Sequence, residues 1–381
     1  MKINLANQPF YIKLVCTLIS LVTIGWLVIE GKRILSPLVF ACLFSILLLP
    51  LANFLEKKCR FKRNMAAIIP VLLMIAFIGG ILYFLGAHIS GLAGDWPTFK
   101  EQLANTAGEL QNWVSQKFHI DPDKQVNYVH KATSKIIDSG TVVAGATLYS
   151  VSAAMLFLSF TLIYTFFFLL YRGLIMKFLV RVFREKNRQL VQDIMEQIKF
   201  IIRKYITGML IEMTIISTFI SIVFSILGIK YAVLLGLITG LFNIIPYIGI
   251  FTAIVISTLI TVAANAAITK VIWVIAILFG THVIDVNILL PAIVGSKAKI
   301  NAMITLLGII IGEMIWGIAG MFLSIPVIAV LKIIFDRVEA LEPWGFLLGE
   351  DPASKPAIKE IKETPSPGNY SPPQEEMHSK K

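Results

Sequence analysis

Long apolar stretches, separated by short polar ones, run along most of this chain. Most of them have the length of about 20 helical residues that crosses the hydrocarbon core of a bilayer. The pattern predicts eight hydrophobic segments, at about residues 14–29, 35–55, 66–87, 148–171, 208–227, 231–264, 271–290 and 302–335. We therefore expect an all-α, polytopic helical membrane protein.

Two of these segments, 231–264 and 302–335, are too long for one simple crossing. A continuous helix of roughly 34 residues would extend about 51 Å, whereas the hydrocarbon core is about 30 Å thick. Both segments contain residues that break helices, namely Asn243, Pro246 and Gly249 in the first and Gly317, Gly320 and Pro326 in the second. We expect each segment to be broken or re-entrant, and the sequence leaves open whether it crosses the bilayer or turns back.

The two over-long segments also share a spacing of small residues. Gly236 and Gly240 form a GxxxG pair in the first, and Gly308 and Gly312 form one in the second. Such pairs allow close contact between helices. Chance similarity and a true repeat both explain the likeness. Paired, interrupted hydrophobic segments are the best indication of a transport site that a sequence offers.

The polar stretches divide the chain into five parts. We expect N-terminal transmembrane helices in 1–88 and an extracytoplasmic amphipathic helical segment in 89–147, where Thr98 and Glu101 match a capping box. Another span and a basic cytoplasmic helix should follow in 148–207, and the transport core in 208–338. The proline-rich residues 339–381 should form a disordered cytoplasmic tail.

Composition and charge support a membrane location. Of the 381 residues, 57% are hydrophobic and 15% are charged, and the mean hydropathy is +0.80. The net charge of +11 does not indicate a nucleic-acid partner, because the basic residues cluster beside apolar segments, as in 56–63 and 172–204. By the positive-inside rule both clusters are cytoplasmic. With a retained first span, the N- and C-termini are then both cytoplasmic.

Acidic residues are rare in the membrane-embedded C-terminal half. Between residues 205 and 335 they are Glu212, Asp285 and Glu313. Each costs at least about 2.5–3.5 kcal/mol at bilayer depth, so such residues usually face a bundle interior or a water-filled path. The alternative is a structural role between helices. The candidate substrate or ion path is Asn243, Pro246, Tyr247, Gly249, Asp285, Asn287, Glu313 and Glu212. His282 is a proton relay or a structural histidine.

A second set of residues is expected to pack or break helices rather than contact solute. These are Gly236, Gly240, Gly308, Gly312, Gly317, Gly320, Pro291 and Pro326. Catalytic motifs for hydrolysis or nucleotide binding are missing from the sequence. Cys16, Cys42 and Cys59 show no metal-site spacing. We therefore expect no enzymatic activity, cofactor or metal.

Three ordered motifs resemble the autoinducer-2 exporter family, also called the PerM-like permeases. The first comprises residues 228–236 and the following Asn243-Ile-Ile-Pro-Tyr-Ile-Gly249. The second extends from Asn287 to Gly295, and the third from Gly317 to Lys332. The likeness covers roughly residues 10–340. It implies a bacterial inner-membrane permease that forms homo-oligomers. Some members export autoinducer-2, and others are similar to sodium or lithium/proton antiporters. One departure is Ile300-Asn301-Ala302, where the family commonly has a His-Pro or Ser-Pro step.

These features support three hypotheses of function. The first is a transporter that exports a small polar solute, with autoinducer-2 as the candidate. The second is a sodium(lithium)/proton antiporter that uses the membrane acids as carriers. The third is a membrane scaffold that transports nothing. The expected partners are the lipid bilayer and a small polar solute or a monovalent cation or proton.

Overall fold

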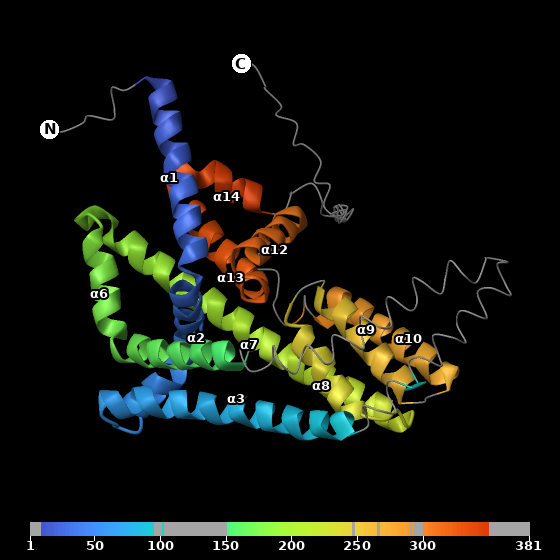
Figure 1. The fold of residues 1–381 in the computed structure, drawn as a ribbon. Helices are drawn as coiled ribbons and strands as arrows, with labels where there is room; N and C mark the ends of the chain where they lie inside the picture. Colours follow the sequence, from blue (N-terminus) through green and yellow to red (C-terminus); the bar gives the residue numbers. More distant parts are fainter. Residues whose placement is uncertain are drawn as a thin grey trace, which may run out of the picture.

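The structure, a computed structural model, describes residues 9–94, 101–102, 151–245, 248–264, 267–289, 292 and 300–349. Within these residues the regular secondary structure is helical, apart from one isolated bridge between Ile300 and Gly349. The helices are α1 (Phe10–Glu30), α2 (Lys32–Lys57), α3 (Arg63–Gly94), Val151–Leu170, α6 (Arg172–Val182), α7 (Arg188–Ile226), α8 (Ala232–Phe242), α9 (Ile248–Ala263), α10 (Ile268–Ile284), the π-helical turn η3 (Asp285–Leu289), α12 (Ala302–Trp316), α13 (Ile318–Phe335) and α14 (Glu342–Leu348), with short 3-10 turns η2 (Glu185–Asn187) and η4 (Glu339–Leu341). Figure 1 shows their arrangement.

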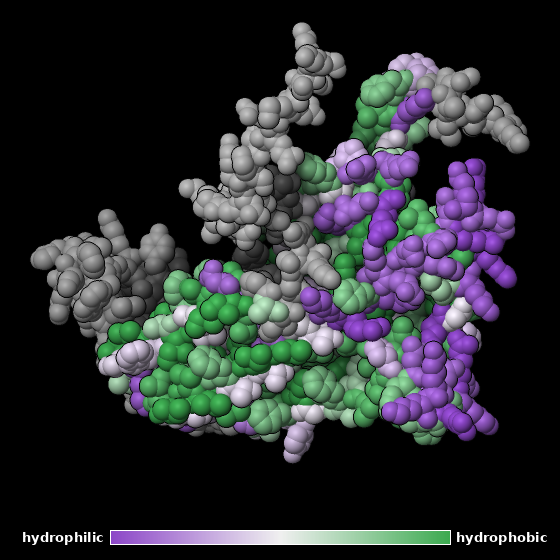
Figure 2. All heavy atoms as spheres, turned by 180° about the vertical axis from the view of Figure 1, so that it is seen from behind, coloured by the Kyte–Doolittle hydropathy of each residue, from purple (hydrophilic) through white to green (hydrophobic). Residues whose placement is uncertain are grey.

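The prediction of a polytopic helical membrane protein is confirmed. Among the described residues, seven helices are long and apolar enough to cross a membrane, and α8, α9 and α12 are shorter apolar helices. Large hydrophobic side chains are exposed along most of them. In Figure 2 the hydrophobic surface covers most of one face, and the polar side chains gather at one end. This distribution fits a molecule whose sides face lipid.

The longest helix, α7, is the central element of the fold. Its 39 residues join the predicted cytoplasmic basic helix to the fifth hydrophobic segment without a break. Twelve of its residues are buried, which is more than in any other described helix. They contribute to two core clusters, one with α2 and α13 and one with α8, α9 and α10. The helix therefore connects both over-long segments to the N-terminal half.

Both over-long segments are broken, as predicted, and both turn back. The first ends α8 at Phe242 and starts α9 at Ile248, and residues of both helices pack in one cluster against α10. The second turns at Gly317, whose φ of 63° and ψ of −140° suit glycine almost alone. A side chain on Gly312 would collide with the Gly320 backbone. The two arms, α12 and α13, therefore lie in direct contact.

Helix α1 is a candidate membrane span, as the sequence predicts, but its link to α2 is shorter than expected. Gly31 alone lies between α1 and α2, with φ −73° and ψ 3°. Helix hairpins use loops of about 2–5 residues, so this link does not fold α1 back along α2. None of the α1 residues is buried, and the N-terminal half of α1 extends beyond the other described helices in Figure 1. The Trp316 indole N–H donates to the Val28 carbonyl, 3.0 Å away, and connects α1 to α12.

The two basic stretches that the sequence assigns to one side of the membrane lie together. Arg172, after the helix Val151–Leu170, forms a salt bridge with Glu56 at the end of α2. The guanidinium of Arg63 lies 3.3 Å from where a Cβ on Gly173 would be. This end of the molecule holds α6 and the start of α7 (Figure 1). Its identity as the cytoplasmic face stays a prediction.

Two predicted boundaries need correction. Helix α3 continues to Gly94, beyond the boundary drawn at residue 88. The prediction of disorder from residue 339 is wrong for its first part, because Glu339–Leu341 and α14 are helical. The Leu348 carbonyl accepts from the Asn301 N–H at 3.0 Å, so α14 is tied to the start of α12. The rest of the predicted tail and most of 89–147 lie outside the described residues.

Candidate functional site

Three of the predicted path residues meet in one hydrogen-bonded cluster. Asn243 follows the last residue of α8, and its side-chain amide nitrogen lies 2.8 Å from Glu212 Oε1 on α7. The same nitrogen lies 3.1 Å from Asp285 Oδ2 at the start of η3. An amide NH₂ group carries two hydrogens, so Asn243 donates one to each acid. The acids are thereby held on either side of a single amide.

The cluster is buried, and no described residue forms a salt bridge with its acids. Glu212 and Asp285 are each 5% exposed. Across the part of the chain that the structure describes, neither acid forms a salt bridge. Asp285 Oδ1 is buried without a hydrogen-bond partner there. Buried charges in proteins are normally paired or bound to an ion, so these carboxylates are suited to take up a proton or a cation.

A cavity of about 150 Å³ adjoins this cluster. The α7 residues Tyr205 and Met209 form part of its wall, and Ile250 contributes from α9. Thr305 and Ile325 contribute from α12 and α13. The cavity therefore lies between the two helical hairpins, where the sequence places the solute path. Its role in transport is a prediction that the geometry permits.

The local backbone explains why the three polar side chains converge. A side chain on Gly240 would collide with Ser217, and its Cβ would lie 2.6 Å from the Met213 carbonyl, so the missing side chain lets α8 lie directly on α7. Helix α8 then ends at Phe242, which leaves Asn243 beside α7. On the other side, α10 passes into a π-helical turn at Asp285. Such turns are frequent at functional sites because they change the direction of side chains.

The other predicted path residues are not in this cluster. Glu313 is exposed on the last turn of α12, and it does not line the cavity. Asn287 is exposed and its amide donates to the Val283 carbonyl at 2.7 Å. Gly249 lies in the tight return after α8, where a Cβ would meet the Phe242 backbone. Pro246 and Tyr247 lie outside the described residues.

The predicted packing and helix-breaking residues are mostly found where helices meet or break. Gly236 packs on α7, where a Cβ would lie 2.7 Å from the Ser217 carbonyl. A Cβ on Gly308 would collide with the Ile328 side chain of α13. Pro326 is buried within α13 and does not interrupt it. Pro291 lies outside the described residues.

Sequence reasoning missed Tyr205 and Thr305, and did not include His282 in the path. Tyr205 lies seven residues before Glu212, two helical turns away on the same face of α7, and that spacing could have indicated it. His282 lines the cavity, and its Nδ1 is buried without a hydrogen-bond partner within the described residues. It therefore belongs among the polar groups around the acids. Among the described residues no group of three or more His, Cys, Asp or Glu could hold a metal ion.

Comparison with known proteins identifies the group to which the chain belongs. The sequence profile of the AI-2E family transporters matches residues 14–340. YrrI of Bacillus subtilis is 28% identical over 319 residues, covering 81% of this chain and 87% of YrrI. YhhT of Escherichia coli K12 is 24% identical over 339 residues, covering 87% of this chain and 93% of YhhT. Both relatives are named provisionally as transport proteins. A match to most of the chain places this protein in the AI-2E transporter family.

Proposed function

We propose that this chain is a membrane transporter that binds a proton or a monovalent cation, such as sodium or lithium, at Glu212, Asn243 and Asp285. This proposal rests on the hydrogen-bonded cluster. In it one amide joins two buried acids that form no salt bridge among the described residues. Membership of a transporter family supports transport as the activity. The cluster supports coupling to a small cation.

The electrostatics of the cluster explain how a bound cation could drive transport. Two unneutralised carboxylates in a buried site would repel each other, and each would lack the hydration it has in water. A proton or a cation supplies the missing positive charge. Loading and release therefore change the net charge of a group that joins α7, α8 and η3. The two hairpins beside the cavity have short arms and broken backbones, which survive in a bilayer where they line protein or water.

A second candidate function is export of a small polar solute, with autoinducer-2 as the candidate. The name of the matched family favours it. Carboxylate oxygens accept hydrogen bonds from hydroxyl groups, so the cluster suits a polyhydroxylated solute. The cavity of about 150 Å³ is smaller than the roughly 300–1,000 Å³ of most ligand pockets, so such a solute would need the hairpins to separate.

Reconstituted protein distinguishes the two candidates. We would load proteoliposomes with a pH-sensitive dye, impose a pH gradient and add sodium or lithium. A cation/proton antiporter dissipates the gradient, and Glu212→Gln and Asp285→Asn abolish this activity. Glu313→Gln is the matched control, because this acid is exposed and outside the cavity. It should exchange cations like the unchanged protein.

Cation exchange lost only in the Glu212 and Asp285 variants supports the cation site. Absence of cation exchange, with efflux of autoinducer-2 from the same vesicles, supports the exporter. If neither flux exceeds that of empty liposomes, the transport proposal is wrong and the scaffold hypothesis takes its place.

The membrane location, the orientation and the oligomeric state are part of the same proposal. We place the chain in the bacterial inner membrane with both termini in the cytoplasm and expect it to form homo-oligomers. The relatives from bacteria and the seven long apolar helices support a multi-pass bacterial membrane protein. Accessibility of a terminal tag in intact and lysed cells tests the orientation, and native mass spectrometry tests the oligomeric state.

A further inference from the structure

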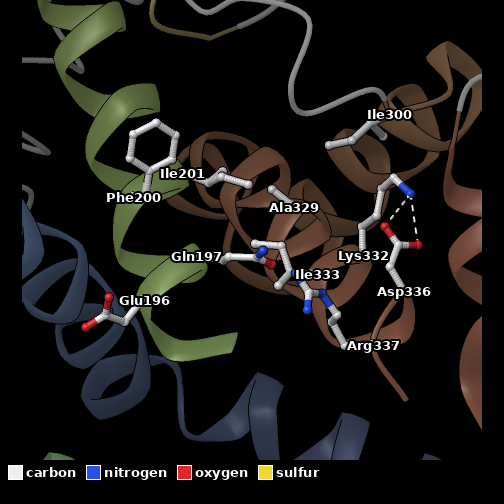
Figure 3. Close-up of a pocket in the computed structure, with 10 residues that line it drawn as sticks. All are labelled: Glu196, Gln197, Phe200, Ile201, Ile300, Ala329, Lys332, Ile333, Asp336 and Arg337. Atoms are coloured by element: carbon white, nitrogen blue, oxygen red, sulfur yellow. Dashed lines mark hydrogen bonds and ion pairs between the residues drawn. The ribbon is translucent and has the colours of Figure 1, made fainter. Parts of the chain in front are cut away.

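A second, larger cavity lies at the basic end of the molecule. This vestibule has a volume of about 600 Å³. Figure 3 shows its walls, with Gln197 and Ile201 from α7 facing Ile333 of α13 and Arg337, which follows the end of that helix. Ile300, just before α12, completes the wall. The proposed function assigns no role to this cavity.

The vestibule and the carboxylate cavity lie along the same face of α7. Gln197 and Ile201 line the vestibule, and Tyr205, Met209 and Glu212 line the cavity. These positions follow one another at steps of three or four residues. Residues at that spacing share one face of a helix. One stripe of α7 therefore passes from the first cavity into the second.

Helix α13 repeats this arrangement in the opposite direction, and α12 repeats it in the same direction as α7. On α13, Ile325 lines the carboxylate cavity and Ala329 and Ile333 line the vestibule, again at steps of four. Ile300, just before α12, lines the vestibule, and Thr305 in the first turn of α12 lines the cavity. The two cavities thus share three walls and lie in line between α7 and α13.

The barrier between the two cavities is about one helical turn thick. Of the described residues that line them, none is shared. On α7 the last vestibule residue is Ile201 and the first cavity residue is Tyr205, a rise of about 6 Å. The step from Ala329 to Ile325 on α13 is the same. Tyr205 is 9% exposed and packs in one apolar cluster with Ile201, Ile325 and Ile333.

We infer that the vestibule is the entrance to the Glu212–Asp285 cavity from the basic end of the molecule, and that Tyr205, which belongs to the same apolar cluster as Ile325, is the gate that closes it. The inference rests on the proposed function, because it assigns the access route to the proposed ion site. Tyr205 has the size to fill the turn between the cavities. The route is specific enough to be tested without measuring transport.

The test uses the rate of thiol labelling in a chain whose native cysteines, Cys16, Cys42 and Cys59, are replaced by serine or alanine. Gln197→Cys reports on the vestibule and Thr305→Cys on the cavity. Each is treated in membrane vesicles of both orientations with a charged, membrane-impermeant methanethiosulfonate. The face that labels Gln197→Cys defines the side to which the vestibule opens.

Opening the gate should expose the cavity from that same face. We expect Tyr205→Ala to raise the labelling rate of Thr305→Cys at least about tenfold, because truncation of a large packed side chain leaves a void that the surroundings fill only in part. Tyr205→Phe keeps the ring and should leave the rate unchanged. Ile206→Ala is the packing control, since Ile206 is buried in the same cluster but lines neither of these cavities.

An unchanged rate in Tyr205→Ala, or labelling of Thr305→Cys from the opposite face only, overturns the inference. An equal increase in Ile206→Ala also overturns it, because a general loosening would then explain the result. Circular dichroism of the purified variants checks that Tyr205→Ala is folded. Failure of the proposed function appears separately, as normal cation exchange in Glu212→Gln and Asp285→Asn with the labelling pattern intact.

Discussion

At the residue scale, the sequence predicted which polar residues could form the site but not which of them come together. Glu212, Asp285 and Glu313 carried the same signal, an acid among apolar residues. The structure buries the first two and exposes the third. Helices α10, which leads into Asp285, and α12, which carries Glu313, are apolar around most of their circumference, so periodicity does not reveal which face meets lipid. Asn243 is hydrogen-bonded to partners 31 and 42 residues away in the sequence. Contacts between residues so far apart depend on tertiary packing, which local sequence patterns do not specify.

Removing the shared amide should destabilise the protein through the acids that it leaves behind. In Asn243→Ala both carboxylates lose a hydrogen bond while remaining buried. A buried polar group left without a partner costs about 1–3 kcal/mol, so the thermal unfolding midpoint in detergent should fall. Adding Glu212→Gln should recover part of the loss, because one of the two facing carboxylates is then neutral. Equal midpoints for Asn243→Ala and the unchanged protein would contradict this account of the cluster.

At the element scale, the sequence predicted where the two over-long segments break but not that the chain turns back after each break. Segment length and helix-breaking residues predicted breaks in 231–264 and 302–335, and the structure confirms both. The direction of the chain after each break depends on backbone angles and close contacts that residue types alone do not fix. A segment that crosses the bilayer and a segment that turns back are both compatible with the same sequence pattern. Gly317 illustrates this, since its positive φ becomes visible only in the structure.

Gly317→Ala should weaken the turn between α12 and α13 through the backbone alone. A Cβ at this position would meet no atom within 4 Å, so the substitution creates no collision. The cost arises because residues other than glycine avoid this conformation, by about 1–3 kcal/mol. Gly79→Ala is the control, since a Cβ there also meets open space and its backbone carries no positive φ. A lower unfolding midpoint in Gly317→Ala than in Gly79→Ala is the expected result.

Gly240→Ala should act through steric conflict and should also disturb the site. The new methyl group would overlap Ser217 and lie 2.6 Å from the Met213 carbonyl on α7. Overpacking of this kind costs about 1–3 kcal/mol, and separating α8 from α7 would lengthen the Asn243–Glu212 hydrogen bond. We expect lower stability and lower cation exchange together. In Gly280→Ala nothing lies within 4 Å of the new carbon, and both properties should be unchanged.

At the scale of the whole molecule, apolar segments and charge clusters predicted the helices but not their assembly. All eight predicted hydrophobic segments correspond to helices or to pairs of helices. The prediction of separate first and second crossings did not anticipate the one-residue link at Gly31. The disorder predicted from 339 was based on proline and charge, which described the composition of this region but not its contacts. Lys332 donates to the Asp336 carboxylate at the end of α13. It also donates to the Gly345 carbonyl, and this bond connects α14 to α13.

The connection between α14 and the start of α12 provides a final prediction for the molecule as a whole. Ile300 and Gly349 form an antiparallel bridge, in which the Asn301 N–H donates to the Leu348 carbonyl. Opposed residues in this arrangement have Cα atoms about 4.5 Å apart, which is within the range of about 4.4–6.8 Å that a disulfide requires.

Ile300→Cys combined with Gly349→Cys, in a chain without the native cysteines, should therefore form a disulfide under mild oxidation. Titration with a maleimide polymer should show both thiols lost together and recovered with reductant. Ile300→Cys with Phe346→Cys is the matched control, because Phe346 is 73% exposed and is not paired with Ile300. Since Ile300 also lines the vestibule, the bond should fix one wall of the entrance. If both pairs oxidise at the same rate, the bridge does not hold α14 in place.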